Sequence, residues 1–359
     1  MKRMLCLLGA VLVLTVCAQA SGLSKDLTRA MPERAEELLR GEDFSGTEGF
    51  TGGIASLLEK VSGQVGTILR QRVRGAASVL LVVILCGVVE GVHGGADGGK
   101  TVLFLPMAGA LSVTLLTAGS LDSLIGLGTE TIGELDTFSK ALLPTLAAAM
   151  AASGQVSTAA FQQVTTVFLV DLLINLIDGL LVPLVYLYIG VLTASACLPK
   201  GHLPALADGL KKVVTWLLTT ALLAFTVYLS VARVIAGSAD SATVKVAKAA
   251  VSSVVPVVGS IIAEASETVL VGAGMLKNTI GVFGMLAILA VCAYPFLQLG
   301  IQYLLYKLTA FLAAAVGAPG LCKLIDGLGG AFGLVLGMTG SCAVLLLISI
   351  LSSVAAVVP

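Results

Sequence analysis

Long apolar runs constrain the fold of this 359-residue chain more than any other feature of its sequence. A helix of roughly 17 to 25 apolar residues is long enough to cross the hydrocarbon core of a bilayer. Only 12% of the residues are charged and 57% are hydrophobic, which leaves too little polar material for a water-soluble surface. The formal net charge is zero and gives no indication of nucleic-acid binding. The sequence therefore predicts an all-α, polytopic integral membrane protein.

About eight spanning helices are expected from the positions of these runs. Two pairs of expected spans meet at prolines, Pro183 and Pro295, where the chain forms either a tight hairpin or one long kinked helix. The expected spans are residues 76–92, 101–119, 161–182, 183–199, 213–235, 278–295, 296–316 and 331–357.

Two further apolar segments, 141–154 and 252–266, are too short to cross and carry a central proline, Pro144 and Pro256 respectively. Non-helical backbone inside a membrane is tolerated where protein or a water-filled cavity satisfies its polar groups. The segments are therefore candidates for broken or re-entrant helices, and interfacial helices are the alternative.

An internal repeat is suggested by the order of these segments. Shifted by 112 residues, Pro144 falls on Pro256 and Pro183 on Pro295, while long and short apolar segments superpose in the same order. Each unit would hold three spans and one broken segment. An odd number of spans would turn the second unit upside down, which gives the inverted repeat of many transporters.

The N-terminal quarter of the chain divides into two parts. Residues 1–20 have the basic start, short apolar core and Ala-Gln-Ala end of a cleaved signal peptide, with an uncleaved anchor as the alternative. Residues 21–75 form a polar segment in which an amphipathic helix starts near Pro32 and the pattern of 54–74 favours a helix along the membrane surface. The multi-spanning membrane domain is expected over residues 76–359.

Three polar residues stand inside the apolar run "VFLVDLLINLIDGLL". Asp171, Asn175 and Asp178 are spaced by four and three residues and so share one helical face. A carboxylate in hydrocarbon is costly, so this face should meet protein or water. It is either an ion or proton pathway, or a polar seam between helices or beside a wet vestibule. Arg233 is the most obvious counter-ion in the sequence.

Motifs for catalysis and cofactor binding are not found. The sequence has no P-loop, no nucleophile elbow and no zinc-protease motif. The seven cysteines form no Cys-x-x-Cys pair. We therefore expect a protein that is not an enzyme and that holds no cofactor or metal. If transport here uses ATP, another subunit supplies the ATPase.

Three stretches resemble one known family. They are "ASETVLVGAGMLKNTIGVFG" (265–284), the preceding "VVPVVGS" (254–260) and "LLPTLAAAMAASGQVSTAAF" (142–161). Together with the order of segments, they resemble the stage III sporulation protein AE family over roughly residues 55 to 355.

The resemblance implies a component of a channel or secretion-like conduit between mother cell and forespore, needed for late forespore gene expression. It implies a multi-pass protein of the mother-cell membrane around the forespore. The implied partners are the lipid bilayer and other subunits of the complex, including a separate ATPase and a forespore membrane partner. Members of the family tend to have amides where this chain has Asp171 and Asp178, and no catalytic residues carry over.

Two other functions stay open from the sequence. The possible inverted repeat and the acidic stripe fit a self-contained secondary transporter or permease. A non-conducting membrane scaffold that assembles partners would also have this hydropathy pattern.

Lys277 and Asn278 interrupt the apolar pattern between glycines. We expect Asn278 to cap the first turn of the span 278–295, and Lys277 to reach the lipid headgroups or pair with Glu264 or Glu267. An ordinary interfacial anchor is the alternative.

Overall fold

The computed structural model describes residues 31–40, 46–93, 104–198, 203–254, 259–316 and 319–354, without the side chains of 46–48, 90–93, 104, 106, 232–254, 259–270 and 319. The described part is almost entirely helical, as the sequence predicted. Its elements are α2 (Glu33–Leu39), α3 (Gly46–His93), α4 (Phe104–Ala152), α5 (Val156–Leu176), the π-helical turn η2 (Ile177–Leu181), α6 (Val182–Cys197), α7 (Leu203–Val254), α8 (Gly259–Val316) and α9 (Pro319–Val354).

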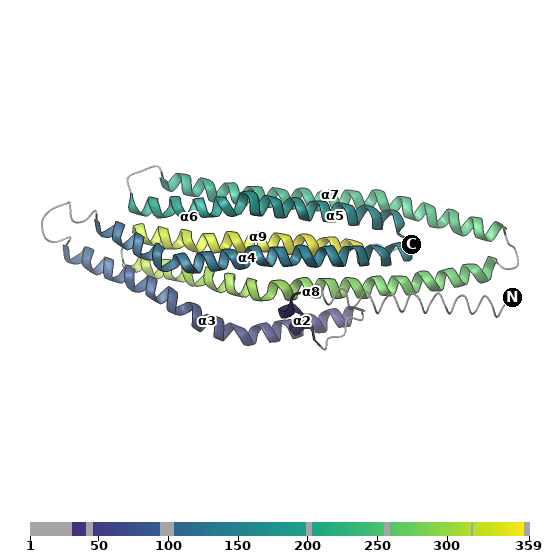
Figure 1. The fold of residues 1–359 in the computed structure, drawn as a ribbon, viewed down its shortest axis with the longest axis horizontal. Coiled ribbons are helices and arrows are strands. Elements are labelled where there is room, and N and C mark those ends of the chain that lie inside the picture. Colours follow the sequence, from purple (N-terminus) through teal and green to yellow (C-terminus); the bar gives the residue numbers. More distant parts are fainter. Residues whose placement is uncertain are drawn as a thin grey trace.

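The long helices lie nearly side by side in an elongated up-and-down bundle (Figure 1). At one end, here called the Cys197 end, α3, α6 and α8 finish and α4, α7 and α9 begin. At the other, here called the Gly154 end, α4 turns into α5, while α7 and α8 extend further (Figure 1).

Six helices of the described residues are long and apolar enough to span a membrane, rather than eight. The count falls because each proline junction is one continuous helix. α8 runs through Pro295, and α5 continues through η2 into α6. Pro183 has no N–H to donate, and the widened turn before it accommodates this loss: the Val182 N–H donates to the Ile177 carbonyl, five residues back.

These helices are much longer than a bilayer requires. The span Met107–Ala152 has 46 residues, which is about 69 Å at a rise of 1.5 Å per residue. A hydrocarbon core is about 30 Å thick. Each long helix must therefore leave the hydrocarbon for a large part of its length or cross it at a strong tilt.

The first proline segment is not separate from the bundle. Residues 141–152 form the last turns of α4, and Pro144 lies on its exposed side within continuous helix. The expected re-entrant segment at 141–154 is therefore not observed. Pro256 lies outside the described residues.

The direction of the helices also changes the proposed repeat. Because α5 and α6 form one rod, only two reversals separate α3 from α6, and the two run in the same direction (Figure 1). The same holds for α4 and α7 and for α5 and α8. Units matched by the 112-residue shift would thus be parallel, and the inverted arrangement expected from hairpins at the prolines is not found.

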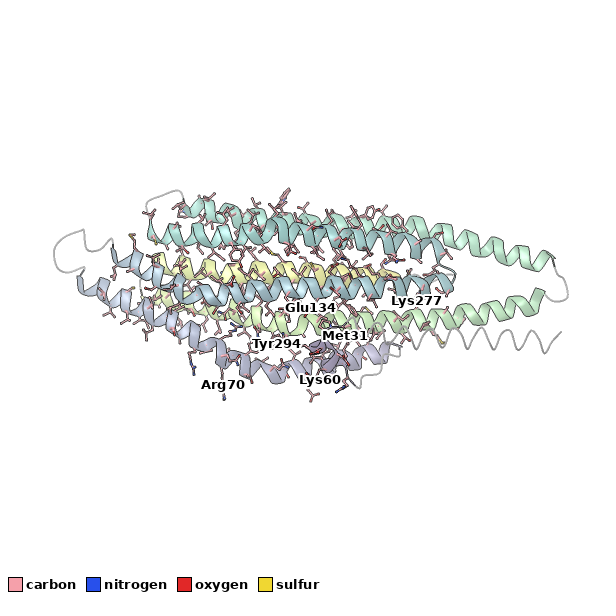
Figure 2. All side chains as sticks on the ribbon, in the orientation of Figure 1. Met31, Lys60, Arg70, Glu134, Lys277 and Tyr294 are labelled. Carbon is pink, nitrogen blue, oxygen red and sulfur yellow. The ribbon has the colours of Figure 1, made fainter. Side chains whose placement is uncertain are left out.

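A short helix, α2, lies where an amphipathic helix was expected near Pro32. Its residues Ala35 and Leu39 are buried, and the Arg34 guanidinium lies 5.0 Å from the centroid of the Tyr294 ring on α8. The Lys60 ammonium donates to the Leu38 carbonyl (Figure 2). Residues 54–74 are not a separate surface helix, because α3 continues through them into the first span. The signal-peptide prediction for residues 1–20 falls outside the described residues.

Candidate functional site

The turn between α4 and α5 positions the polar stripe predicted from the sequence. Gly154 has a φ of 87°, a left-handed conformation that glycine adopts without a Cβ clash. The N–H of Gly154 donates to the Ala151 carbonyl and that of Gln155 to the Met150 carbonyl, both at 3.0 Å. The two helices therefore form an antiparallel hairpin, in which residues equally distant from the turn lie at one level.

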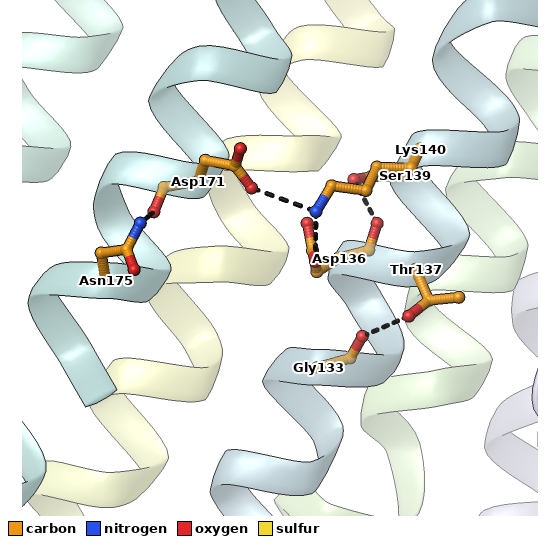
Figure 3. Close-up of polar contacts among 7 residues, drawn as sticks. All are labelled: Gly133, Asp136, Thr137, Ser139, Lys140, Asp171 and Asn175. Atoms are coloured by element: carbon orange, nitrogen blue, oxygen red, sulfur yellow. Dashed lines mark hydrogen bonds and ion pairs between the residues drawn. The ribbon is translucent and has the colours of Figure 1, made fainter. Parts of the chain in front are cut away.

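Lys140 of α4 and Asp171 of α5 meet across this hairpin. The Lys140 Nζ lies 3.1 Å from Asp171 Oδ1 and 2.8 Å from Asp136 Oδ2 (Figure 3). The Asn175 amide donates to the Asp171 carbonyl oxygen at 2.9 Å. Two carboxylates and one ammonium thus form a small cluster with an excess of negative charge.

The cluster lies at the surface of the chain. The side chains of Lys140 and Asp171 are 47% and 50% exposed, and Asn175 and Asp178 are exposed too. Asp136 is more enclosed: its Oδ1 is buried and, among the described residues, accepts no hydrogen bond. The stripe of Asp171, Asn175 and Asp178 therefore faces away from the bundle interior.

Sequence reasoning missed the cation of this cluster. It named Arg233, whose side chain is outside the description, whereas Lys140 is the ion-pair partner of Asp171. A signal was available: Lys140 and Asp171 lie nearly equally far from the Gly154-Gln155 turn. Recognising 141–154 as the end of a helix would have exposed that symmetry.

A second polar feature, which the sequence reasoning also missed, lies inside the bundle between α5 and α9. The Gln162 amide donates to the Ser349 carbonyl oxygen at 2.6 Å, and the hydroxyls of Thr166 and Ser349 are 2.7 Å apart. All three residues are buried. We call this contact the α5–α9 seam. Polar residues recur at helical spacing in "TAAFQQVTT", which would have predicted a polar inner face.

A third group of polar side chains joins α3, α4 and α8. Arg72 donates to Gln298 Oε1 at 2.7 Å, and the Tyr306 hydroxyl donates to Thr117 Oγ1 at 3.1 Å. Between them on α8 lies Gln302, which is 2% exposed and whose Oε1 has no hydrogen-bond partner within the described part of the chain. The bundle interior thus contains two sets of polar contacts, one between α5 and α9 and one among α3, α4 and α8.

The Lys277–Asn278 pair lies differently from expectation. Both residues are well inside α8, so Asn278 does not cap a helix start. Lys277 is 5% exposed and points into the bundle, not toward headgroups, whereas Asn278 is exposed (Figure 2). The side chains of Glu264 and Glu267 are not described.

Among the described residues, no group of three or more histidine, cysteine, aspartate or glutamate side chains is placed to hold a metal ion. The polar groups of these sites are amides, hydroxyls and a few charges, which form the hydrogen bonds and ion pairs given above.

Comparison with known proteins gives consistent results. A profile of the family described as stage III sporulation protein AE matches residues 46–357. The protein called stage III sporulation protein AE in Bacillus subtilis (strain 168) is 28% identical over 212 residues, which are 59% of this chain and 53% of that relative. The alignment thus spans about half the length of the relative. No solved structure matches the chain.

Proposed function

The chain belongs to the stage III sporulation protein AE family, which gives it a role in sporulation, and we propose that this role is to form the membrane part of a conduit between mother cell and forespore. In this proposal the protein resides in the mother-cell membrane around the forespore. A forespore membrane partner and a separate ATPase complete the complex.

One observation favours a conduit over a passive anchor: the first half of α5 is polar on its buried side and apolar on its exposed side. Its outward residues Phe161, Val164 and Phe168 are 41%, 71% and 63% exposed. Its buried side chains include Thr158, Gln162, Thr165 and Thr166. A helix of a water-soluble bundle has the reverse pattern, so this one faces lipid and turns its polar groups to the protein interior.

Burial of these polar groups in a membrane interior costs free energy, and a passive anchor would not need them. Buried polar groups in a bilayer need partners, and intramembrane polar residues commonly mark pathways. The α5–α9 seam supplies hydrogen bonds for Gln162 and Thr166, so the seam is stable when closed. Separation of α5 from α9 would expose these amide and hydroxyl groups to water and open a hydrophilic route.

The acidic stripe has a different place in the proposal. Because Asp171, Asn175 and Asp178 face outward beside Lys140, they serve contact with another protein rather than line a path within this chain. An Asp171→Asn, Asp178→Asn variant should then weaken recovery of partner subunits with this protein. Unchanged recovery would leave the stripe without this role.

The test replaces the native gene with a Gln162→Leu, Thr166→Val variant, which keeps side-chain volume but removes the polar face. Gln163→Leu, one position along and less buried, is the matched control. Late forespore-specific gene expression and protein level are measured together. The conduit predicts loss of expression at normal protein level in the double variant alone. Full expression would contradict it and favour a non-conducting scaffold.

A further inference from the structure

The outward side of α4 has an unusual composition for a helix of a membrane protein. Between Gly119 and Lys140, its exposed residues include no large apolar side chain, and seven of them follow one another at alternating spacings of four and three. We call this set the α4 ridge: Gly119, Ser123, Gly126, Glu130, Gly133, Thr137 and Lys140. Lipid does not solvate such a surface well, so either water or a polar partner covers it.

Packing within the described part of the chain does not require the glycines of the α4 ridge. A Cβ added at Gly119, Gly126 or Gly133 would meet nothing within 4 Å. Glycine in a helix interior costs about 1 kcal/mol relative to alanine. The three recur every seven residues, the spacing of a helix–helix contact line. Small residues in such a line let a second helix approach closely.

α3 has a comparable line on its own outward side. We call it the α3 ridge: Gly63, Gly66, Arg70, Arg74 and Ala77, all exposed. A Cβ at Gly63 or Gly66 would again meet nothing within 4 Å. The opposite side of α3, with Leu57, Ile68 and Val79, is buried in the bundle.

The two ridges carry opposite charge. Beside or on the α4 ridge are Asp122, Glu130 and, across the hairpin, Asp178, and none of them is in an ion pair of the described residues. The same holds for Arg70 and Arg74 on the α3 ridge. The chain thus presents an acidic and a basic face, whose charges form no ion pair within the described residues, although Arg34 of α2 lines the same small cavity as Glu130.

The opposite charges also lie at matching heights. Counted along the helices, Arg74 is 19 residues before the end of α3 at His93, and Asp122 is 18 residues after the start of α4 at Phe104. Both positions are therefore about 27 to 29 Å from those neighbouring helix ends at a rise of 1.5 Å per residue. Copies rotated about an axis normal to the membrane keep their heights, so these charges would meet.

We propose that copies of this chain associate head to tail in the membrane, with the α3 ridge of one copy on the α4 ridge of the next. Such a contact joins two different faces, so repetition gives a closed ring where the rotation closes. Arg70 and Arg74 then neutralise Asp122 and Glu130, and the glycines of both ridges let the backbones approach. This association concerns assembly and does not depend on whether the assembly conducts.

Disulfide trapping in membranes tests the contact. In a background without the native cysteines, Ala77→Cys is placed on one co-expressed chain and Gly119→Cys on the other, at nearly equal heights. The proposal predicts a 77–119 cross-link between chains and little 77–77 or 119–119 product. A Val164→Cys chain, whose cysteine lies on the lipid-facing side of α5, replaces the Gly119→Cys chain as the control and should give no cross-link.

Charge reversal tests whether the contact is specific, and it distinguishes loss of the contact from misfolding of the chain. Arg70→Glu with Arg74→Glu on the Ala77→Cys chain should lower the 77–119 product severalfold. Asp122→Lys with Glu130→Lys on the partner chain should restore it. Symmetric products in place of 77–119, or loss of the 77–119 product without rescue, would overturn the proposal. Absence of any cross-link in the parent pair would overturn it too, because another protein or lipid then covers the ridges.

Discussion

The two helices of one hairpin, α4 and the first half of α5, expose opposite chemistry. Between Gly119 and Lys140, α4 buries its large apolar residues, such as Leu135 and Phe138, and exposes glycines, hydroxyls and charges. α5 buries Gln162 and Thr166 and exposes Val164 and Phe168. This part of α4 has the outward pattern of a water-soluble helix, and the first half of α5 has that of a helix in lipid.

This difference indicates that the bundle does not lie in one uniform surrounding. A single bilayer around all six long helices would require the same outward chemistry at a given height. The apolar side of α5 continues onto α7, where Tyr228 stacks on Phe161 with ring centroids 6.2 Å apart. Lipid therefore covers the α5–α7 side, and polar material, protein in our proposal, covers the α4 ridge.

The largest expected effect comes from placing a charge on each outward face. Phe168→Lys puts an ammonium into lipid and should cost about 2.5 to 3.5 kcal/mol on insertion scales, whereas Thr137→Lys on the α4 ridge should cost little. The fraction of protein that resists alkaline extraction from membranes measures this. An equal loss of membrane-inserted protein for both variants would show that the two outward faces do not differ in their surroundings.

Two glycines of α4 give the next effect. A Cβ at Gly128 would overlap the Val335 Cγ1 methyl group of α9, whereas one at Gly126 meets nothing. Gly128→Ala should therefore destabilise the chain by about 1 to 3 kcal/mol through overpacking, and Gly126→Ala should not. Thermal denaturation in detergent, which separates the copies, gives the two midpoints. A drop for Gly126→Ala as large as for Gly128→Ala would contradict this assignment of faces.

The α5–α9 seam sets the third effect. Gln162→Ala removes the hydrogen bond to the Ser349 carbonyl oxygen and should cost about 1 to 2 kcal/mol in a membrane interior. Gln163→Ala, whose side chain is less buried, is the control and should change the midpoint by much less. Equal midpoints for both variants would mean that the seam is not closed in the folded protein.

The smallest effect is expected at the surface cluster. Lys140→Met removes an ion pair whose members are about half exposed, and such pairs contribute about 0 to 1 kcal/mol. The unfolding midpoint of the isolated protein should barely move. A large drop would show that the cluster is enclosed even in the isolated protein.

The class of fold was readable from sequence because hydropathy directly reports residues that cannot be solvated by water. The membrane helices and α2 followed from run length, helical spacing and the proline at the start of α2. The number of spans did not follow, because a proline in an apolar run ends a helix in one context and kinks it in another. At Pro183 the helix continues because of the π-helical turn that precedes the proline, and the local sequence does not predict this turn.

The site was predictable only in part. The shared face of Asp171, Asn175 and Asp178 follows from spacing, but the direction of that face depends on which helices pack against α5. Lys277 shows the same limit: its charge suggested the interface, yet its side chain is buried because the preceding residues continue α8 beyond the expected span. Tertiary packing determines both the direction of the polar stripe and the burial of Lys277, and the local spacing of residues does not predict that packing.

The most direct test compares spin labels on the two outward faces at one height in a bilayer. Thr137→Cys on α4 and Leu172→Cys on α5 lie nearly equally far from the α4–α5 turn, and both positions are exposed. Collision rates with lipid-dissolved oxygen and with a water-soluble nickel complex are measured at each. We expect high oxygen and low nickel collision rates at residue 172, as in lipid, and a low oxygen collision rate at residue 137. High oxygen and low nickel collision rates at both sites would contradict this expectation.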